Sequence, residues 1–114
     1  MIAHVIGASV LGYFVWDETA FLLLDIGFIW NIYLDGEMGL RPETLALSEL
    51  RAAIDRDFFE EVTRPTPVPN PSPIESVEVF EHNDGRRLVL TCEEQNLVLE
   101  TSFSTRDITI EHKE

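Results

Sequence analysis

Between residues 21 and 34, large apolar side chains recur at every second position of the chain. The residues that share this spacing are Leu22, Leu24, Ile26, Phe28, Trp30, Ile32 and Leu34. Because successive side chains of a strand point to opposite faces, this period predicts one long strand with these residues turned toward a core. A helix is disfavoured, since it would place the charge of Asp25 among apolar positions. Asp25 then lies on the second face and is not expected to be a buried catalytic acid.

The second face of this strand is too apolar to be covered by water alone. Phe21, Leu23, Ile29 and Tyr33 share it with Asp25, Gly27 and Asn31, so we call it the mixed face. A helix, a loop or a second copy of the chain is expected to cover part of it. If a second copy covers it, these four residues form an interaction surface and the protein is a homo-oligomer, most simply a dimer. Gly27 in the middle of the strand indicates a bend, a bulge or a close backbone approach.

Residues 1–36 are predicted to form an N-terminal hairpin region. The polar centre of the stretch WDETAF, residues 16–21, predicts a four-residue loop over residues 17–20 that sets Trp16 opposite Phe21, with the register open by one residue. The large aromatic residues of the two arms either fill the core or line an apolar ligand pocket. They are Phe14, Trp16, Phe28 and Trp30.

A single helix is predicted over residues 44–62, followed by a proline-rich connector over residues 63–73. Leu50, Ile54 and Phe58 fall at helical spacing on one face of this helix, and Ser48 or Thr44 is its candidate N-cap. Proline stands at every second position from 65 to 73. Each proline fixes its own φ and disfavours helix at the residue before it, so the connector is expected to be a stiff extended strap.

The last third of the chain, residues 74–112, is predicted to be a four-stranded meander. Its strongest turn signal is the Asp84-Gly85 pair, flanked by β-rich segments. Strands with one inserted helix indicate an α+β protein. The expected architecture is one domain over residues 1–114, with an antiparallel sheet of six to seven strands that carries the helix and is curled or partly barrel-like.

The chain has 21 acidic and 8 basic residues, a net charge of −13. Such a charge keeps molecules apart and attracts basic partners. It offers no basic patch for a phosphate backbone or an anionic lipid surface, so neither nucleic acid nor a membrane is an expected partner. No stretch reaches the ~18–20 apolar residues of a membrane span. Residues 1–16 lack the positive charge that begins a signal peptide, so a cytoplasmic location is expected.

The sequence contains no recognisable catalytic or metal-binding motif. Cys92 is the only cysteine, which excludes an internal disulfide, and it lies in an apolar alternation typical of a core. His4, His82 and His112 are not at the spacings of metal ligands. The acidic residues at 17–18 and 35–37 are expected at opposite ends of the long hairpin. No catalytic residue, metal or cofactor is therefore assigned.

Three functions are compatible with these features. The first is a non-catalytic interaction module that self-associates through the mixed face of the long strand. The second is an acidic inhibitor or immunity-type protein that neutralises a basic partner, which rests on the net charge alone. The third is a small-ligand-binding domain or enzyme with an apolar pocket. The first is the preferred hypothesis from the sequence.

Overall fold

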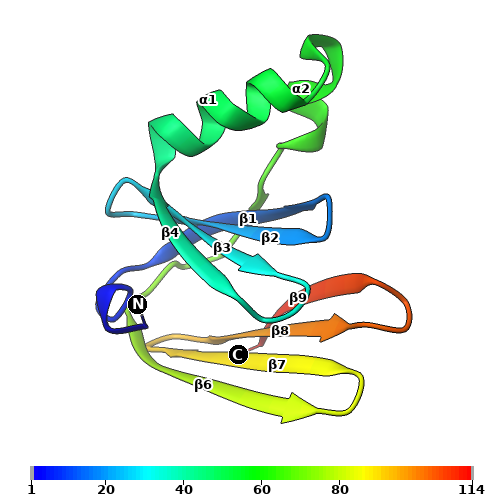
Figure 1. Cartoon of the computed structure of the whole chain (residues 1–114). Coiled ribbons are helices and arrows are strands. Elements are labelled where there is room, and N and C mark those ends of the chain that lie inside the picture. Colours follow the sequence, from blue (N-terminus) through cyan, green and yellow to red (C-terminus); the bar gives the residue numbers. More distant parts are fainter. Residues whose placement is uncertain (1, 114) are drawn as a thin grey trace.

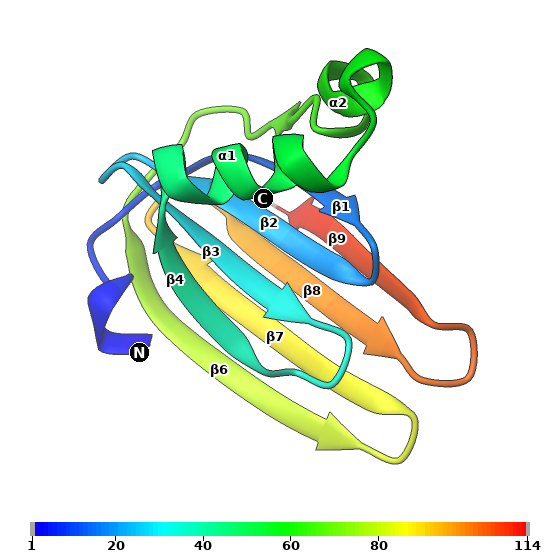
Figure 2. The same ribbon diagram turned by 45° about the horizontal axis from the view of Figure 1, so that its top comes forward.

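Two antiparallel sheets and a pair of helices form three layers (Figure 1). The computed structural model describes residues 2–113. The strand order is β4-β3-β2-β1-β5 in the first sheet and β6-β7-β8-β9 in the second. The helices cover one side of the first sheet and the second sheet lies on its other side (Figure 2). The α+β class is therefore confirmed, but two sheets replace the single curled sheet of six to seven strands.

The elements follow one another in an order close to the predicted one. The N-terminal part contains η1 (Ile2–His4), β1 (Val10–Trp16), β2 (Thr19–Leu24), β3 (Phe28–Tyr33) and β4 (Met38–Pro42). The helices are α1 (Glu43–Ala53) and α2 (Arg56–Val62), and the strap contributes β5 (Thr66–Pro67). The C-terminal sheet contains β6 (Ile74–His82), β7 (Gly85–Cys92), β8 (Asn96–Ser102) and β9 (Asp107–Lys113).

The predicted long strand is in fact a hairpin, β2 and β3, joined by a turn at residues 25–27. Gly27 has φ of +80°, a conformation that glycine adopts at low cost, and Asp25 Oδ1 accepts a hydrogen bond from the Ser9 amide at 2.9 Å. Ile26 is exposed at the turn and not in the core. Leu22 pairs with Trp30, so even-numbered residues lie opposite even-numbered residues. The period of two therefore continues unbroken through the turn, which is why the pattern resembled one strand.

The first hairpin is tighter than predicted. Residues 17 and 18 alone form its loop, with φ of +50° and +59°. Positive φ at both positions is the geometry of a two-residue hairpin turn that matches strand twist. Trp16 therefore pairs with Thr19, and Phe14 pairs with Phe21 and stacks on it at a centroid distance of 4.7 Å. The expected Trp16–Phe21 register is wrong by two residues.

The main core lies between the two sheets. Trp30, Leu22 and Leu90 are fully buried there, and Cys92 is also buried, as its apolar alternation predicted. Burial raises the pKa of the Cys92 thiol, because the thiolate loses hydration. The even-numbered residues of β2 and β3 face this core, which explains why apolar side chains recur at every second position.

Two helices take the place of the single predicted helix. Ile54 is extended, and the Asp55 carboxylate caps α2 by accepting a hydrogen bond from the Asp57 amide at 2.9 Å. Because the chain is extended at Ile54, α2 turns a different face to the core from the one that a continuous helix would. Phe59 is therefore buried, while Phe58 is 56% exposed. The first helix begins at Glu43, so Ser48 is not its N-cap. Neither helix within residues 2–113 has the length and apolar character needed to cross a membrane.

The helices cover the mixed face of β2 and β3. Phe21 and Ile29 are 5% and 0% exposed, in a second core that includes Leu50, Ile54 and Phe59. The sequence left open whether a helix, a loop or a second copy of the chain covers this face. In the structure, helices of the same chain cover it. This second core fixes the position of α1 over the first sheet.

The proline-rich segment joins the helical layer to the second sheet. Thr66 and Pro67 pair with β1, and Val68 is buried in the main core. Gln95 donates a hydrogen bond from Nε2 to the Pro69 carbonyl at 2.6 Å. The segment is therefore a strap that lies along the molecule, extended at residues 66–67 as predicted but bent at Asn70, which has φ of +50°.

The C-terminal meander is confirmed, with one correction at its first turn. The turn residues are 83 and 84, and Gly85 is already the first residue of β7. Gly85 lies against the backbone of Thr101 on β8, so it provides a close approach and not the turn. The Asp84 carboxylate accepts hydrogen bonds from Ser102 and Ser104, which hold its pKa below the usual value.

Candidate functional site

The turn between β1 and β2 and the turn between β3 and β4 lie at the same end of the molecule. Figure 2 shows both of them at the end where the β6–β7 and β8–β9 turns also lie. This follows from the turn at residues 25–27, which reverses the chain between the two acidic loops. The prediction that residues 17–18 and 35–37 occupy opposite ends is therefore wrong.

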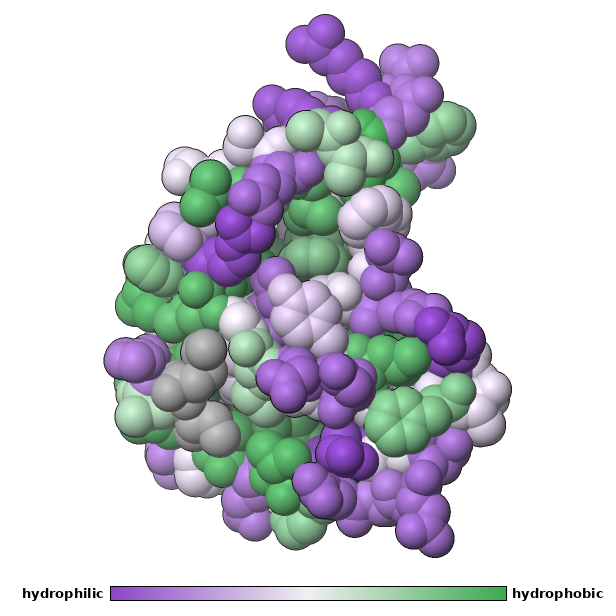
Figure 3. All heavy atoms as spheres, viewed as in Figure 1, coloured by the Kyte–Doolittle hydropathy of each residue, from purple (hydrophilic) through white to green (hydrophobic). Residues whose placement is uncertain are grey.

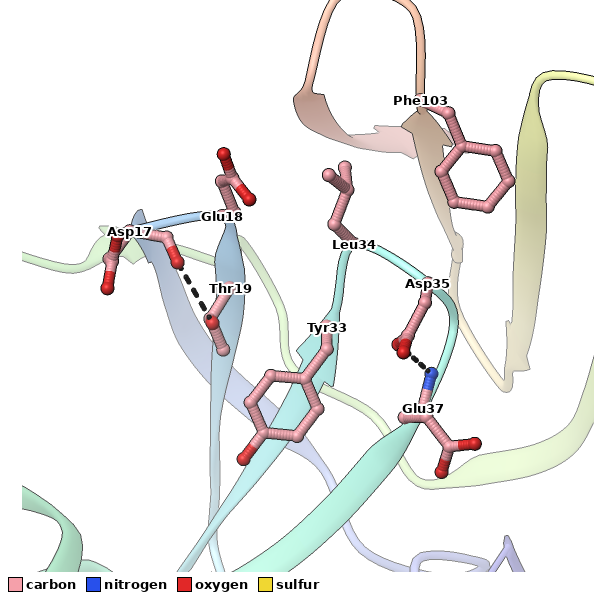
Figure 4. Close-up of a pocket in the computed structure, with 8 residues that line it drawn as sticks. All are labelled: Asp17, Glu18, Thr19, Tyr33, Leu34, Asp35, Glu37 and Phe103. Carbon is pink, nitrogen blue, oxygen red and sulfur yellow. Dashed lines mark hydrogen bonds between the residues drawn. The ribbon is translucent and has the colours of Figure 1, made fainter.

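An open cleft of about 390 Å³ lies between these turns and the β8–β9 turn. Four carboxylate residues line it (Figure 4): Asp17, Glu18, Asp35 and Glu37. The other lining residues are Thr19, Tyr33, Leu34 and Phe103. We call this hollow the acidic cleft. It combines negative charge with two aromatic rings.

Within residues 2–113, most of the negative charge in the acidic cleft has no cationic partner. Arg106 binds Glu18 in a bidentate pair, with N–O distances of 2.7 and 2.6 Å. Asp35 Oδ1 accepts a hydrogen bond from the Glu37 amide at 2.9 Å, which shapes the β3–β4 turn. Among the described residues, no salt bridge reaches Asp17, Asp35 or Glu37. Three of the four carboxylates are therefore uncompensated.

A second hollow, of about 220 Å³, lies between α1 and the outer side of the first sheet. Its apolar lining consists of Phe21, Ala46, Leu50 and Ala53, and its polar lining of Thr19, Asn31, Tyr33, Arg41 and Glu49. Figure 3 shows hydrophobic residues recessed beneath the helical layer, with hydrophilic residues around them. We call it the helix hollow. It shares Thr19 and Tyr33 with the acidic cleft, so the two hollows adjoin.

An ion pair connects the two sides of the helix hollow. Arg41 on β4 makes a bidentate contact with Glu49 on α1, one arm of which is 2.6 Å long. The hydrogen bonds from Arg41 lower the pKa of the Glu49 carboxyl. Both side chains are partly exposed, so the pair contributes modestly to stability. It joins α1 to β4 beside the helix hollow.

Asn31 is a buried polar residue at the floor of the helix hollow. It lies on β3 between Phe21 of β2 and Gly39 of β4 and is 5% exposed. Its Oδ1 atom has no hydrogen-bond partner among the described residues. Opposite it on β4, a Cβ at Gly39 would meet the Tyr33 hydroxyl oxygen at 3.9 Å.

The residues predicted as an interaction surface are divided by the helical layer. Phe21 and Ile29 are buried beneath it, and Leu23 is half-buried at its edge. Tyr33 is 39% exposed and lines both hollows. Tyr33 is therefore the residue of this set that a partner can reach most readily.

The residues predicted as an apolar pocket lie on two different sides of the first sheet. Phe14 and Trp16 belong to the core under the helices, whereas Trp30 is buried between the sheets. Phe28 is half-buried at the start of β3, on the face that Trp30 shares. The structure does not bring the four together around one hollow.

Sequence reasoning missed two parts of this site, Asn31 and the convergence of the acidic turns. A carboxamide within an otherwise apolar strand was the available signal for Asn31. Among residues 2–113, no group of three histidine, cysteine or carboxylate side chains is placed to hold a metal ion together. Comparisons with protein-family models, curated proteins and solved structures found no match.

Proposed function

We propose that this protein is a non-catalytic interaction module that binds a basic partner protein through the acidic cleft. The observation that carries the proposal is the convergence of two acidic turns on one open hollow. Three of its carboxylates have no cationic partner among the described residues. A lysine or arginine side chain of a partner would supply the missing charge.

The chemistry of the lining suits a cationic side chain. Tyr33 offers a ring that attracts ammonium and guanidinium groups, and the ring of Phe103 already accepts such a contact from Arg86, 5.7 Å from its centroid. The net charge of −13 would also steer a basic protein toward this surface and accelerate its association.

Self-association is the second candidate, and fewer accessible residues support it than the sequence predicted. The helices bury Phe21 and Ile29, which leaves Tyr33 as the most accessible residue of the predicted surface. Two chains of net charge −13 also repel one another. A basic partner is therefore preferred to a second copy of the chain.

Neutralising two cleft carboxylates is expected to weaken binding of a basic peptide about tenfold, or ~1.4 kcal/mol. The variant is Asp17→Asn with Asp35→Asn. Asparagine tolerates the positive φ of residue 17 and keeps the Oδ1 acceptor of residue 35, so the fold is preserved. The probe is an acetylated, amidated peptide of alternating arginine and glycine, titrated by calorimetry at low and physiological ionic strength.

The matched control is Glu93→Gln with Glu94→Gln, which removes the same two charges from the β7–β8 turn at the other end of the second sheet. The affinity of this control for the peptide should fall by less than threefold, because only the long-range electrostatic field of the protein changes. Equal losses in the two variants would show that binding follows net charge and not the cleft, and would overturn the proposal.

A further inference from the structure

The burial of Asn31 destabilises the folded protein unless its amide group forms a hydrogen bond. Apolar side chains surround Asn31 beneath the helix, among them Phe21, Ala46 and Leu50, and the charged Arg41 and Glu49 of the same hollow are paired with each other. A buried amide atom without a hydrogen bond loses its hydration and gains nothing in return. Leucine of similar size would pack against the same neighbours without that loss. The helix hollow is thus built around a polar group that lacks its partner.

A peptide bond is the group that matches this carboxamide best. Because Oδ1 is fully buried, the amide nitrogen is the atom of Asn31 that can meet a ligand in the hollow, where it can donate to a peptide C=O. The match holds whichever way round the amide lies in the strand, since a peptide N–H can donate to an amide oxygen in the same place. The apolar wall formed by Phe21, Ala46, Leu50 and Ala53 leaves room for one apolar side chain beside that peptide bond.

The neighbouring acidic cleft identifies the kind of peptide. Thr19 and Tyr33 line both hollows, so a chain bound in one lies next to the other. We propose that the partner presents an extended segment in which an apolar residue lies close to a basic residue. The apolar side chain packs under α1, its backbone pairs with Asn31, and the basic side chain enters the acidic cleft. This inference rests on the proposed function and specifies its partner.

The test is a titration of ¹⁵N-labelled protein with short synthetic peptides, followed at the side-chain amide of Asn31. The probes are acetylated, amidated alanine peptides that carry one leucine and one arginine, separated by a varied number of alanines. One spacing should give a saturable shift of the Asn31 amide together with shifts at residues 17–19 and 33–37. Replacing its leucine with alanine should reduce the affinity about tenfold.

Two variants of α1 provide a matched pair. Ala53→Trp places a large side chain at the exposed rim of the helix hollow, whereas Ala52→Trp places it on an exposed position that does not line the hollow. The first should abolish the Asn31 shift and the second should leave it unchanged. Asn31→Leu should fold with an equal or higher melting temperature yet bind the peptide about tenfold more weakly, because the orphan amide is gone.

Each other outcome overturns the inference in a recognisable way. Shifts confined to residues 17–19 and 33–37 would leave the acidic cleft as the site and remove the helix hollow from it. An equal Asn31 shift with N-acetyl-leucine amide alone would assign the hollow to a small amide ligand and not to a peptide segment. No saturable shift at any spacing would refute this inference, and titration with the arginine–glycine peptide would then show whether the acidic cleft still binds a basic partner.

Discussion

Replacing Gly85 with alanine is expected to destabilise the protein by about 3 kcal/mol or more. A Cβ at this position would lie 1.9 Å from the backbone carbonyl oxygen of Thr101 and 3.0 Å from its Oγ1. The first contact is with backbone, so β7 and β8 would have to move apart. That movement would break the hydrogen bond from the Arg86 amide to Thr101 Oγ1, which is 2.9 Å long. Since small domains are stable by roughly 5–15 kcal/mol, the loss is a large part of the total.

Gly39→Ala is the matched control for this prediction. Its Cβ would meet only the Tyr33 hydroxyl oxygen, at an ordinary 3.9 Å, and the backbone there does not have positive φ. The control should change the free energy of unfolding by less than about 1 kcal/mol. Urea denaturation followed by tryptophan fluorescence measures both variants. A Gly85→Ala protein as stable as the control would show that the sheet does not have this close approach.

Replacing Trp30 with alanine is expected to cost about 3–5 kcal/mol. Its side chain is fully buried between the sheets and lies between Leu22 and Leu40 on the neighbouring strands. Removal of the indole leaves a cavity that the surrounding strands can close only in part. The indole N–H also has no hydrogen-bond partner among the described residues, so the native residue carries a desolvation cost of its own.

Trp30→Phe separates these two effects. Phenylalanine keeps an aromatic body in the core and removes the orphan donor, so its cost should be well under half that of alanine. Thermal and urea unfolding compare the native protein with Trp30→Ala and Trp30→Phe. Phe103→Ala is the control at a more exposed aromatic residue. If phenylalanine proved as damaging as alanine, the indole nitrogen would have to have a partner in the folded protein.

The C-terminal meander could be predicted from the sequence because each of its strands pairs with the next strand along the chain. Leu88, Leu90 and Cys92 alternate on one face, and the turn signals lie between short strands that pair with their sequence neighbours. Each strand could be assigned without knowledge of any distant contact. The extended part of the strap was predicted for a similar reason, since proline restricts its own backbone, but the bend at Asn70 was not.

The arrangement of the N-terminal half could not be read in this way. The turn at residues 25–27 preserves the alternation, so the pattern of apolar residues could not distinguish one long strand from a hairpin. Both sides of the first sheet are buried, by the helices and by the second sheet. That is why its mixed face was more apolar than a surface strand allows.

The candidate site was missed because it depends on that turn. With β2 and β3 read as one strand, the acidic loops are separated by the length of the sheet. With the hairpin in place, Asp17 and Asp35 line one cleft. Asn31 was read as an ordinary polar residue because its burial depends on the distant helix α1. Long-range contacts of this kind are not encoded in local periodicity.

The most direct test of the proposed function is the native mass of tagged protein purified from its own host under low-salt conditions. We expect a complex of one 13.0 kDa chain with a second, basic protein. The complex should be lost in the Asp17→Asn/Asp35→Asn variant and retained in the Glu93→Gln/Glu94→Gln control. A homodimer unaffected by the cleft variant, or a bare monomer, would contradict the account of the acidic cleft as the binding site for a basic partner.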